Sequence, residues 1–281
     1  MSGGSGSLGL ILLGMALAGI ATPALAHSLL DGAIVQRLPA LLTGLLLIAV
    51  WLVYLAGCRR IAPHAGRAWL FHSAATLAAL TLLGPIDAWA KTGAALHMAQ
   101  HMLLMAVIAP LWVLARPLPQ WRAALGRRLR WLWWWPLLAA QQPLTMAAIH
   151  AAMIWFWHAP RPYLLALDNP WWHGFEHVCF LFSSGLFWWA VLRANPSNRG
   201  RALLALLITL MHTGLLGALL TFANTPLYGD ATDLGDQQLA GLIMWVPGGL
   251  VYLLAAAYCG HIWMRQLGRH ADGVVLSRER S

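Results

Sequence analysis

Long apolar runs of similar length, separated by short polar stretches, divide this chain of 281 residues. Seven of them approach the roughly 20 residues that an α-helix needs to cross a hydrocarbon core of about 30 Å. They are residues 39–57, 68–87, 94–115, 136–157, 172–192, 202–222 and 239–260. The stretches between them are too short for a soluble domain. The pattern therefore predicts an all-α fold, a polytopic membrane bundle of seven transmembrane helices.

A further apolar stretch, residues 8–20, lies within the first 26 residues and is followed by a proline and an Ala-Leu-Ala triplet. This is typical of a signal peptide with an A-x-A cleavage site, although no basic residue precedes the stretch. We predict a signal peptide over residues 1–26 and the seven-helix transmembrane domain over residues 27–281. An uncleaved segment would instead make an eighth helix. Cleavage would give His27 a free amine beside its ring, a chelate suited to Cu(II), although a flexible N-terminus is the interpretation that we favour.

Composition supports the membrane class. The chain is 60% hydrophobic and 10% charged, and its mean hydropathy is +0.65. Soluble domains carry about a quarter charged residues, so soluble and disordered proteins are excluded. The net charge of +9 would ordinarily point to nucleic acid, but basic residues placed between apolar runs face anionic membrane lipid instead. The three cysteines are too far apart to form a CxxC pair.

Charged residues are divided unequally between the two sides of the predicted bundle. One set of loops holds fifteen of the 18 basic residues, namely Arg59, Arg60, Arg67, Arg116, Arg122, Arg127, Arg128, Arg130, Arg193, Arg199, Arg201, Arg265, Arg269, Arg278 and Arg280. The opposite set holds seven of the nine acidic residues, namely Asp31, Asp87, Asp168, Glu176, Asp230, Asp233 and Asp236. The positive-inside rule makes the first set cytoplasmic. The N-terminus is then outside and the C-terminus is cytoplasmic.

Tryptophan and proline add detail to these spans. Tryptophans gather where spans end, and we interpret them as interfacial belts. They include Trp155, Trp157, Trp171 and Trp172 on the outer side and Trp188 and Trp189 on the inner side. Prolines inside or near the runs, Pro85, Pro110, Pro143 and Pro247, predict kinks that neighbouring helices can tolerate.

Two histidine pairs give the strongest signal for a functional site. Ionisable groups at membrane depth are costly and tend to mark function. His97 and His101 are four residues apart on the third span, so their rings project from one face, one turn apart. His173 and His177 repeat this spacing at the start of the fifth span. Both spans run from outside to inside, which places both pairs within about two turns of the outer surface.

These pairs point to a metal site, because neutral imidazole binds copper, zinc, iron and nickel. His158, at the outer end of the fourth span, lies at the same level. Glu176 can ligate, hold a histidine tautomer or move a proton. The predicted ligands are therefore His97, His101, His158, His173, Glu176 and His177. Interfacial histidines satisfied by backbone or water are the alternative.

Other polar and soft side chains have two interpretations each. Met98, Met102, Met105 and Met244 are soft ligands for Cu(I), but methionine also fills gaps in apolar cores, and we favour the core. His150 and His212 lie near mid-membrane, where we favour hydrogen bonds between helices over an inner relay. The acidic loop at residues 224–238 either attracts a metal or basic partner or only keeps the loop solvated.

Four sequence blocks occur over residues 84–260. They are HxxQHxLL followed by AP from His97, WHxPxxY from Trp157, HxxEHxxF with FWW from His173, and DQQxxGxxMWxPGG from Asp236. In these blocks and their order the chain resembles the multi-span CtaG-type cytochrome c oxidase assembly factors, which differ from the single-span copper chaperone of the same name. The resemblance implies a bacterial inner-membrane protein that handles copper for the copper centre of a haem-copper oxidase. Copper as cofactor, an oxidase subunit and a copper chaperone as partners, and no enzymatic activity are then expected.

Three other functions remain to be compared with this one. His173-x-x-Glu176-His177 matches the inverzincin pattern, in which two histidines bind zinc and the glutamate is the base of a peptidase. Paired helical histidines also occur in haem-binding or iron-binding redox proteins. A metal transporter is favoured if His150 and His212 continue the polar path inward. A direct copper donor and a scaffold for another donor are equally compatible with the sequence.

Overall fold

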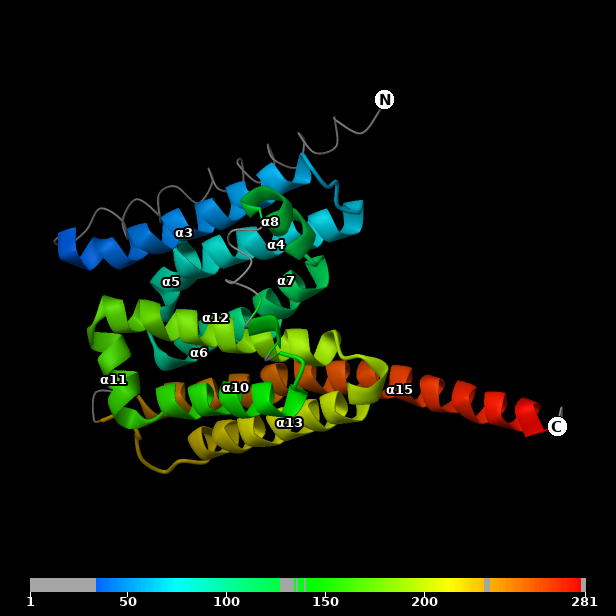
Figure 1. The fold of residues 1–281 in the computed structure, drawn as a ribbon. Coiled ribbons are helices and arrows are strands. Elements are labelled where there is room, and N and C mark those ends of the chain that lie inside the picture. The colour runs from blue at the N-terminus through cyan, green and yellow to red at the C-terminus, as the bar shows by residue number, and fades with distance from the viewer. Residues whose placement is uncertain (1–33, 127–133, 135, 139, 230–232, 279–281) are drawn as a thin grey trace.

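Every regular element of the computed structural model is a helix within the part of the chain that it describes, residues 34–126, 134, 136–138, 140–229 and 233–278 (Figure 1). The predicted signal peptide, residues 1–26, and His27 lie outside these residues, so both stay predictions. The all-helical part of the prediction is confirmed for the described chain.

The helices follow one another with short connections. The first half contains α3 (Ile34–Cys58), α4 (Ala65–Leu82), α5 (Pro85–Ala90), α6 (Ala94–Met102), the π-helix η1 (Leu103–Ile108), α7 (Ala109–Ala115) and α8 (Leu118–Leu125). The second half contains α10 (Pro143–Trp157), α11 (Pro160–Asp168), α12 (Pro170–Leu192), η3 (Pro196–Asn198), α13 (Arg199–Thr221), α14 (Leu234–Ile243), the π-helix η4 (Met244–Gly248) and α15 (Gly249–Arg278).

Six helical stretches of the described chain are long and apolar enough to cross a membrane. They are Arg37–Cys58, Ala65–Ala90, Ala94–Ala115, Pro170–Leu192, Pro196–Thr221 and Leu234–Gly268. The predicted run at residues 136–157 contains α10, an apolar helix of only 15 residues. The chain is thus a multi-pass membrane protein by the length and composition of its helices, while the seventh span stays a prediction.

Proline shapes two of the long stretches through π-helical turns. Pro110 follows η1, which joins α6 to α7, and Pro247 lies inside η4, which joins α14 to α15. A proline removes one backbone N–H and crowds the preceding turn, and a wider π-turn accommodates this without ending the helix. Pro85 follows the break between α4 and α5. Pro143 begins α10, where its missing N–H breaks no helical bond, so the predicted kink at Pro143 is wrong.

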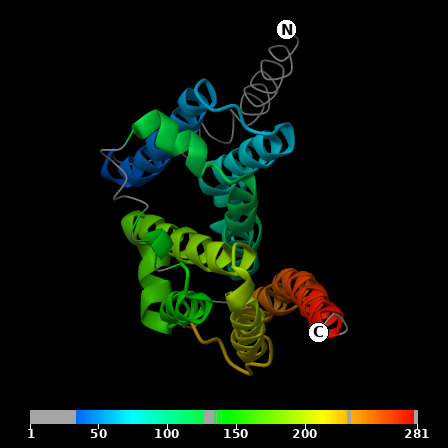
Figure 2. The same ribbon diagram turned by 45° about the vertical axis from the view of Figure 1, so that its right-hand side comes forward.

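The helices pack as two groups, which are joined by the stretch from α6 to α7 and by contact between α3 and α12. Helices α3, α4 and α8 lie together at the N-terminal side of the molecule, and α10, α12, α13 and α15 lie together at the other (Figures 1 and 2). Helix α7 contacts both α4 and α12, while α6 contacts α14. Helices α6 and α12 face each other inside the bundle, where their histidine and glutamate side chains come into contact.

Two of the tryptophans lie in the interior and not at an interface. Trp157 and Trp188 are each only 1% exposed, so the interfacial prediction is wrong for them. The indole nitrogen of Trp188 donates to the carbonyl of Met105 at 2.7 Å, which satisfies its polar atom inside the core. Trp155, Trp171 and Trp172 are exposed, as the prediction requires.

The methionine stripe packs in the core, which confirms that prediction. The four side chains are buried in one cluster with Ile154, Trp157 and Phe180, and they are Met98, Met102, Met105 and Met244. Unbranched methionine adapts to the irregular space beside the two π-turns. Met102 also lies against Gly248 of η4, where an added Cβ would come within 2.8 Å of its sulfur.

Helices α13 and α14 approach closely through two glycines. A Cβ on Gly241 would lie 2.5 Å from the carbonyl oxygen of Gly217 and 2.6 Å from the Thr221 hydroxyl. A Cβ on Gly217 would lie 2.8 Å from the carbonyl oxygen of Gly241. Small residues let membrane helices pack backbone to backbone, and here they hold α14 against α13.

We expect Gly241→Ala to lower the free energy of unfolding by about 1–3 kcal/mol, because the new methyl group meets backbone and must push the helices apart. Denaturant unfolding of the purified protein in detergent, followed by far-ultraviolet circular dichroism, measures the change. Gly185→Ala on α12 is the matched control, since nothing lies within 4 Å of its added Cβ. Equal stability of the two variants would contradict the prediction.

Candidate metal centre

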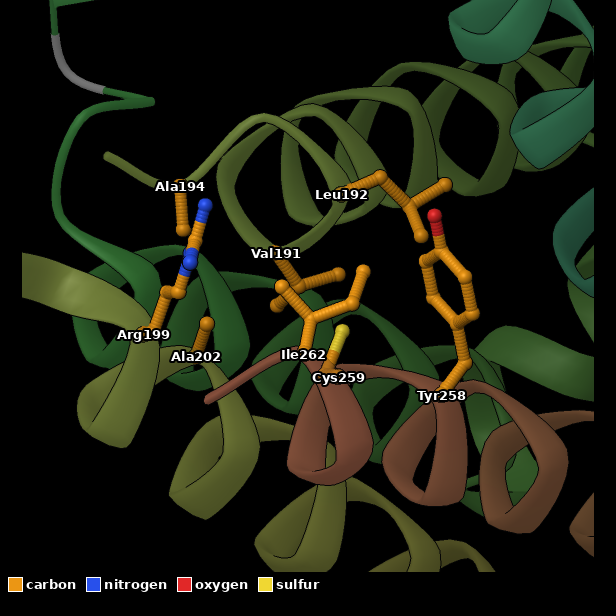
Figure 3. A pocket seen from close by; sticks show the side chains of 8 residues that line it. All are labelled: Val191, Leu192, Ala194, Arg199, Ala202, Tyr258, Cys259 and Ile262. Carbon is orange, nitrogen blue, oxygen red and sulfur yellow. The ribbon is translucent and has the colours of Figure 1, made fainter. Parts of the chain in front are cut away.

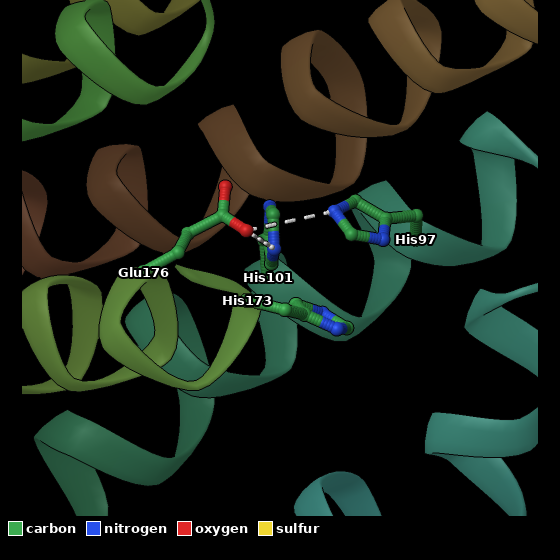
Figure 4. A group of neighbouring side chains, drawn as sticks. All are labelled: His97, His101, His173 and Glu176. Atoms are coloured by element: carbon green, nitrogen blue, oxygen red, sulfur yellow. Dashed lines mark ion pairs between the residues drawn. The ribbon is translucent and has the colours of Figure 1, made fainter. Parts of the chain in front are cut away.

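Helices α6 and α12 bring the two histidine pairs face to face. Within each pair the ring centres are 4.3 Å apart for His97 and His101 and 4.2 Å apart for His173 and His177. Across the helices they are 5.1 Å apart for His97 and His173 and 5.5 Å apart for His101 and His177. The side chains of His97 and His101 point toward α12, and those of His173 and Glu176 point toward α6 (Figure 4). The sequence spacing predicted only that the two rings of each pair share one face of a helix. The arrangement of α6 and α12 brings the two pairs together.

Glu176 lies between the helices and touches both. Its Oε2 is 3.6 Å from Nε2 of His101 and 3.9 Å from Nε2 of His97, and the residue is fully buried. His97, His101, His173 and Glu176 each offer one ligand atom, and these four atoms lie within 4.8 Å of one another. Metal–imidazole bonds of about 2.0–2.1 Å place two ligand atoms of one ion about 3–4 Å apart. The group needs only a small inward movement to hold an ion.

His158 reaches the same cluster from the end of α10. Its ring centre is 6.3 Å from that of His101, and its Nδ1 lies 2.7 Å from the carbonyl oxygen of Ile154. A carbonyl only accepts hydrogen bonds, so Nδ1 donates and Nε2 keeps its lone pair. Burial lowers the pKa of His158 to about 4, although the bond to Ile154 opposes this shift. The imidazole is therefore neutral near pH 7, in the form and tautomer that bind metal.

The ligand atoms of the cluster have no hydrogen-bond partners among the described residues. The eight buried atoms concerned are Nε2 of His97, Nδ1 and Nε2 of His101, Nε2 of His158, Nε2 of His173, Oε1 and Oε2 of Glu176, and Nε2 of His177. Each buried polar atom without a partner costs about 1–3 kcal/mol. All six predicted ligands thus contribute at least one buried polar atom without a partner, with His97, His101, His173 and Glu176 at the centre and His158 and His177 beside His101. This fits a bound metal, while their role as ligands stays a prediction.

Aromatic side chains enclose the cluster. Tyr163 lies edge-on to His97, with ring centres 5.8 Å apart, and stacks on Tyr228 at 3.9 Å. Phe180, one turn beyond His177 along α12, covers His101 at 4.7 Å. Burial, together with the charges of Glu176 and Asp236, raises the pKa of Tyr163 to about 12. Tyr163 therefore stays a neutral phenol.

His173 is the most accessible of the clustered residues. It is partly exposed, whereas His97, His101 and Glu176 are buried. An ion pair between Lys91 and Asp87, 2.7 Å apart, lies at the C-terminal end of α5. The cluster is thus enclosed on most sides, and the imidazole of His173 is its one partly accessible ligand.

Asp236 and Gln100 position α6, a function that sequence reasoning missed. The carboxylate of Asp236 accepts hydrogen bonds from the backbone N–H of Ala94 and, at 3.2 Å, of Ala95, and so caps the helix that carries His97. Gln100 Nε2 donates to the carbonyl of Thr81 at 2.7 Å. The only feature of the local sequence that pointed to a cap from elsewhere was Gly93, which lies directly before α6 and has no side chain to cap this helix. The acidic loop was therefore interpreted too simply, because Asp236 is structural.

The mid-membrane histidines do not join the cluster. His150 Nδ1 lies 3.0 Å from the hydroxyl of Ser183, which links α10 to α12 and confirms the predicted hydrogen bond between helices. Both ring nitrogens of His212 are buried without a hydrogen-bond partner among the described residues, so the same prediction is wrong for His212.

A cavity of about 80 Å³ lies at the opposite end of α12 (Figure 3). Its lining includes Val191, Arg199, Tyr258 and Cys259. It shares no residue with the histidine cluster, so the chemistry of the cluster does not depend on it.

Comparison with known proteins shows the family of the chain. The family model described as cytochrome c oxidase caa3 assembly factor (Caa3_CtaG) matches residues 44–266. This range contains all six residues predicted as ligands as well as Asp236. Neither the search of curated proteins nor the search of solved structures found a match.

We expect Asp236→Asn to lower the free energy of unfolding by about 0.5–2 kcal/mol, because the charge that caps the first turn of α6 is lost. Denaturant unfolding in detergent measures the loss. Asp168→Asn is the control, since Asp168 is an exposed residue at the end of α11 and its change should stay within about 0.5 kcal/mol. A variant of Asp236 as stable as the control would show that the cap contributes nothing.

Proposed function

Because the chain belongs to the cytochrome c oxidase caa3 assembly factor family, we propose that it binds copper in its histidine cluster and passes it to a haem-copper oxidase subunit. One observation carries the copper-binding part of this proposal. Four ligand groups from two helices, His97, His101, His173 and Glu176, converge within 4.8 Å inside the bundle. Such polar atoms are costly to bury unless something satisfies them. A copper ion held by neutral imidazoles would do so.

The chemistry of the ligands suits a donor better than a storage site. Thiolates bind copper tightly, but none of the three cysteines belongs to the cluster. Imidazole and carboxylate ligands hold copper more loosely, which favours transfer. The partial exposure of His173 offers a route by which copper can reach or leave the buried ligands. A periplasmic copper chaperone is the expected source of the metal.

Charge along the chain supports a site on the outer side of a bacterial inner membrane. We propose seven spans after a signal peptide at residues 1–26, a periplasmic N-terminus and a cytoplasmic C-terminus, because the basic residues collect on one side. The clustered histidines then lie near the periplasmic ends of α6 and α12. This is the side on which a cation from the periplasm would arrive.

The packing around the cluster argues against the rival functions. A haem bound by two histidines needs a slot for the porphyrin between their rings, but these rings contact one another and Tyr163 directly. A peptidase needs its general base open to water and substrate, whereas Glu176 is fully buried. Membership in an assembly factor family likewise suggests assembly and not catalysis. A transporter would need the path to continue inward, but Phe180 covers His101 on that side.

We expect replacement of His97, His101, His173 and His177 together by alanine to abolish copper binding, because it removes four of the five imidazoles of the cluster. Copper is measured by mass spectrometry on detergent-purified protein loaded under reducing and under oxidising conditions. Oxidase maturation is measured in cells as the copper content and activity of the oxidase, and should fall to the level of a deletion strain.

The matched control replaces histidines that lie outside the cluster, His64, His72, His212 and His261. This variant should keep copper and mature the oxidase. Wild-type protein that holds no stoichiometric copper would overturn the proposal. A fourfold cluster variant without copper that still matures the oxidase would overturn direct donation and favour a scaffold.

The proposed topology predicts that alkaline phosphatase fused after Ser281 stays inactive, because that enzyme needs the oxidising periplasm. A fluorescent protein fused at the same position should fold and fluoresce in the cytoplasm. Fusions at Asp168, in the predicted outer loop, should give the opposite pair of results. Active phosphatase at Ser281 would reverse the orientation and move the cluster to the cytoplasmic side.

A further inference from the structure

The histidine cluster consists of two levels, one helical turn apart. Helices α6 and α12 both begin at the cluster, and each carries one histidine and a second histidine four residues later. The first members, His97 and His173, have ring centres 5.1 Å apart and form the outer level. The second members, His101 and His177, have ring centres 5.5 Å apart and form the inner level. On each helix the ring centres of the two levels are 4.2–4.3 Å apart.

Each level has the spacing of ligands around one ion. A metal–nitrogen bond of about 2.0–2.1 Å, with about 1.2 Å from the nitrogen to the ring centre, keeps two imidazoles of one ion within about 6.4 Å, centre to centre. Both pairs across the helices meet this requirement. His158 meets it as well, because its ring centre is 6.3 Å from that of His101. We therefore assign His158 to the inner level with His101 and His177, and the outer level has His97 and His173.

The cluster also has more buried polar atoms without a partner than one copper ion can satisfy. Eight buried nitrogen and oxygen atoms from six side chains have no hydrogen-bond partner among the described residues. A single ion with two to four ligands would leave at least half of them without a partner, at about 1–3 kcal/mol each. Both ring nitrogens of His101 are among these atoms, but the neutral ring carries a proton on one of them, so His101 offers one lone pair and ligates on one level only.

Glu176 connects the two levels. Its Oε2 lies 3.9 Å from Nε2 of His97 on the outer level and 3.6 Å from Nε2 of His101 on the inner level. Two Cu(I) ions and this carboxylate carry a net charge of +1 (+2 − 1), whereas two Cu(II) ions leave +3 (+4 − 1). The larger charge is far more costly to bury among neutral imidazoles. The surroundings therefore favour the reduced metal.

We propose that the cluster holds two Cu(I) ions, one at His97 and His173 and one at His101, His158 and His177, with the carboxylate of Glu176 between them. This rests on the proposed function and adds the stoichiometry and the division of the ligands. The outer ion is the one nearer His173, the partly exposed ligand, and leaves first. The inner ion stays behind three buried imidazoles.

The test is the copper content of the untagged full-length protein, loaded with excess Cu(I) under ascorbate and argon and then desalted. Wild type should hold two copper ions per chain. His97→Ala with His173→Ala should hold one, and so should His158→Ala with His177→Ala. His212→Ala is the control for a half-buried histidine outside the cluster and should hold two. His27→Ala should also hold two, which excludes an ion at the N-terminus.

Each contrary result has a distinct meaning. Wild type with one copper ion, lost equally in both double variants, would overturn the two-ion arrangement and leave the proposed function intact. Wild type with none would overturn both. Loss of one ion in His27→Ala would place the second ion at the N-terminus and also overturn the arrangement.

A titration of wild type avoids any dependence on the folding of the variants. The loaded protein is titrated with a chromogenic Cu(I) chelator, and release is followed by absorbance. Two equivalents released in two separate steps support an outer ion and an inner ion of different accessibility. Release of one equivalent in one step contradicts the proposal.

Discussion

The contact of one buried carboxylate with imidazoles from a facing helix is the interaction around which the described structure is organised. Glu176 of α12 lies against His97 and His101 of α6, far from water. In an apolar bundle such groups are stable only where they satisfy one another or hold an ion. The two helices must therefore meet at this depth and in this rotation. The tyrosines and phenylalanine around the cluster exclude lipid and water from it.

Much of the remaining fold supports the position of α6. Its first turn is capped by Asp236 of α14, and α14 is held against α13 by the close packing of Gly217 and Gly241. Its inner end passes into the π-helix η1 before Pro110. A π-turn changes the rotation of the residues that follow it, so His97 and His101 can face α12 while α7 still packs on α4. Positions far from the cluster thus determine its geometry.

The burial and the ligand types of the cluster relate the family assignment to physical properties of the protein. An assembly factor that handles copper must bind it firmly enough to exclude other ligands and loosely enough to release it. If it holds copper as proposed, a cluster of imidazoles and one carboxylate, buried except for the partly exposed His173, would combine both properties. Enclosure would stabilise bound copper by excluding water, and ligands without a thiolate would hold it loosely enough for release. The two levels would separate these tasks between a nearer and a deeper set of ligands.

The sequence by itself determined the membrane class, the positions of the long helices and the two histidine pairs, because these depend on hydrophobic length and on the 3.6-residue period of a helix. It also indicated His158 and Glu176, since the alternating direction of the spans placed them at one depth. Only the tertiary structure decided that all six side chains meet, that Asp236 caps α6, and that Trp157 and Trp188 are interior. These depend on the rotation of each helix about its axis and on contacts between residues more than 80 positions apart, such as Asp236 with Ala94 and Trp188 with Met105. Local periodicity carries no information about such contacts, because it is the packing of neighbouring helices that sets the rotation.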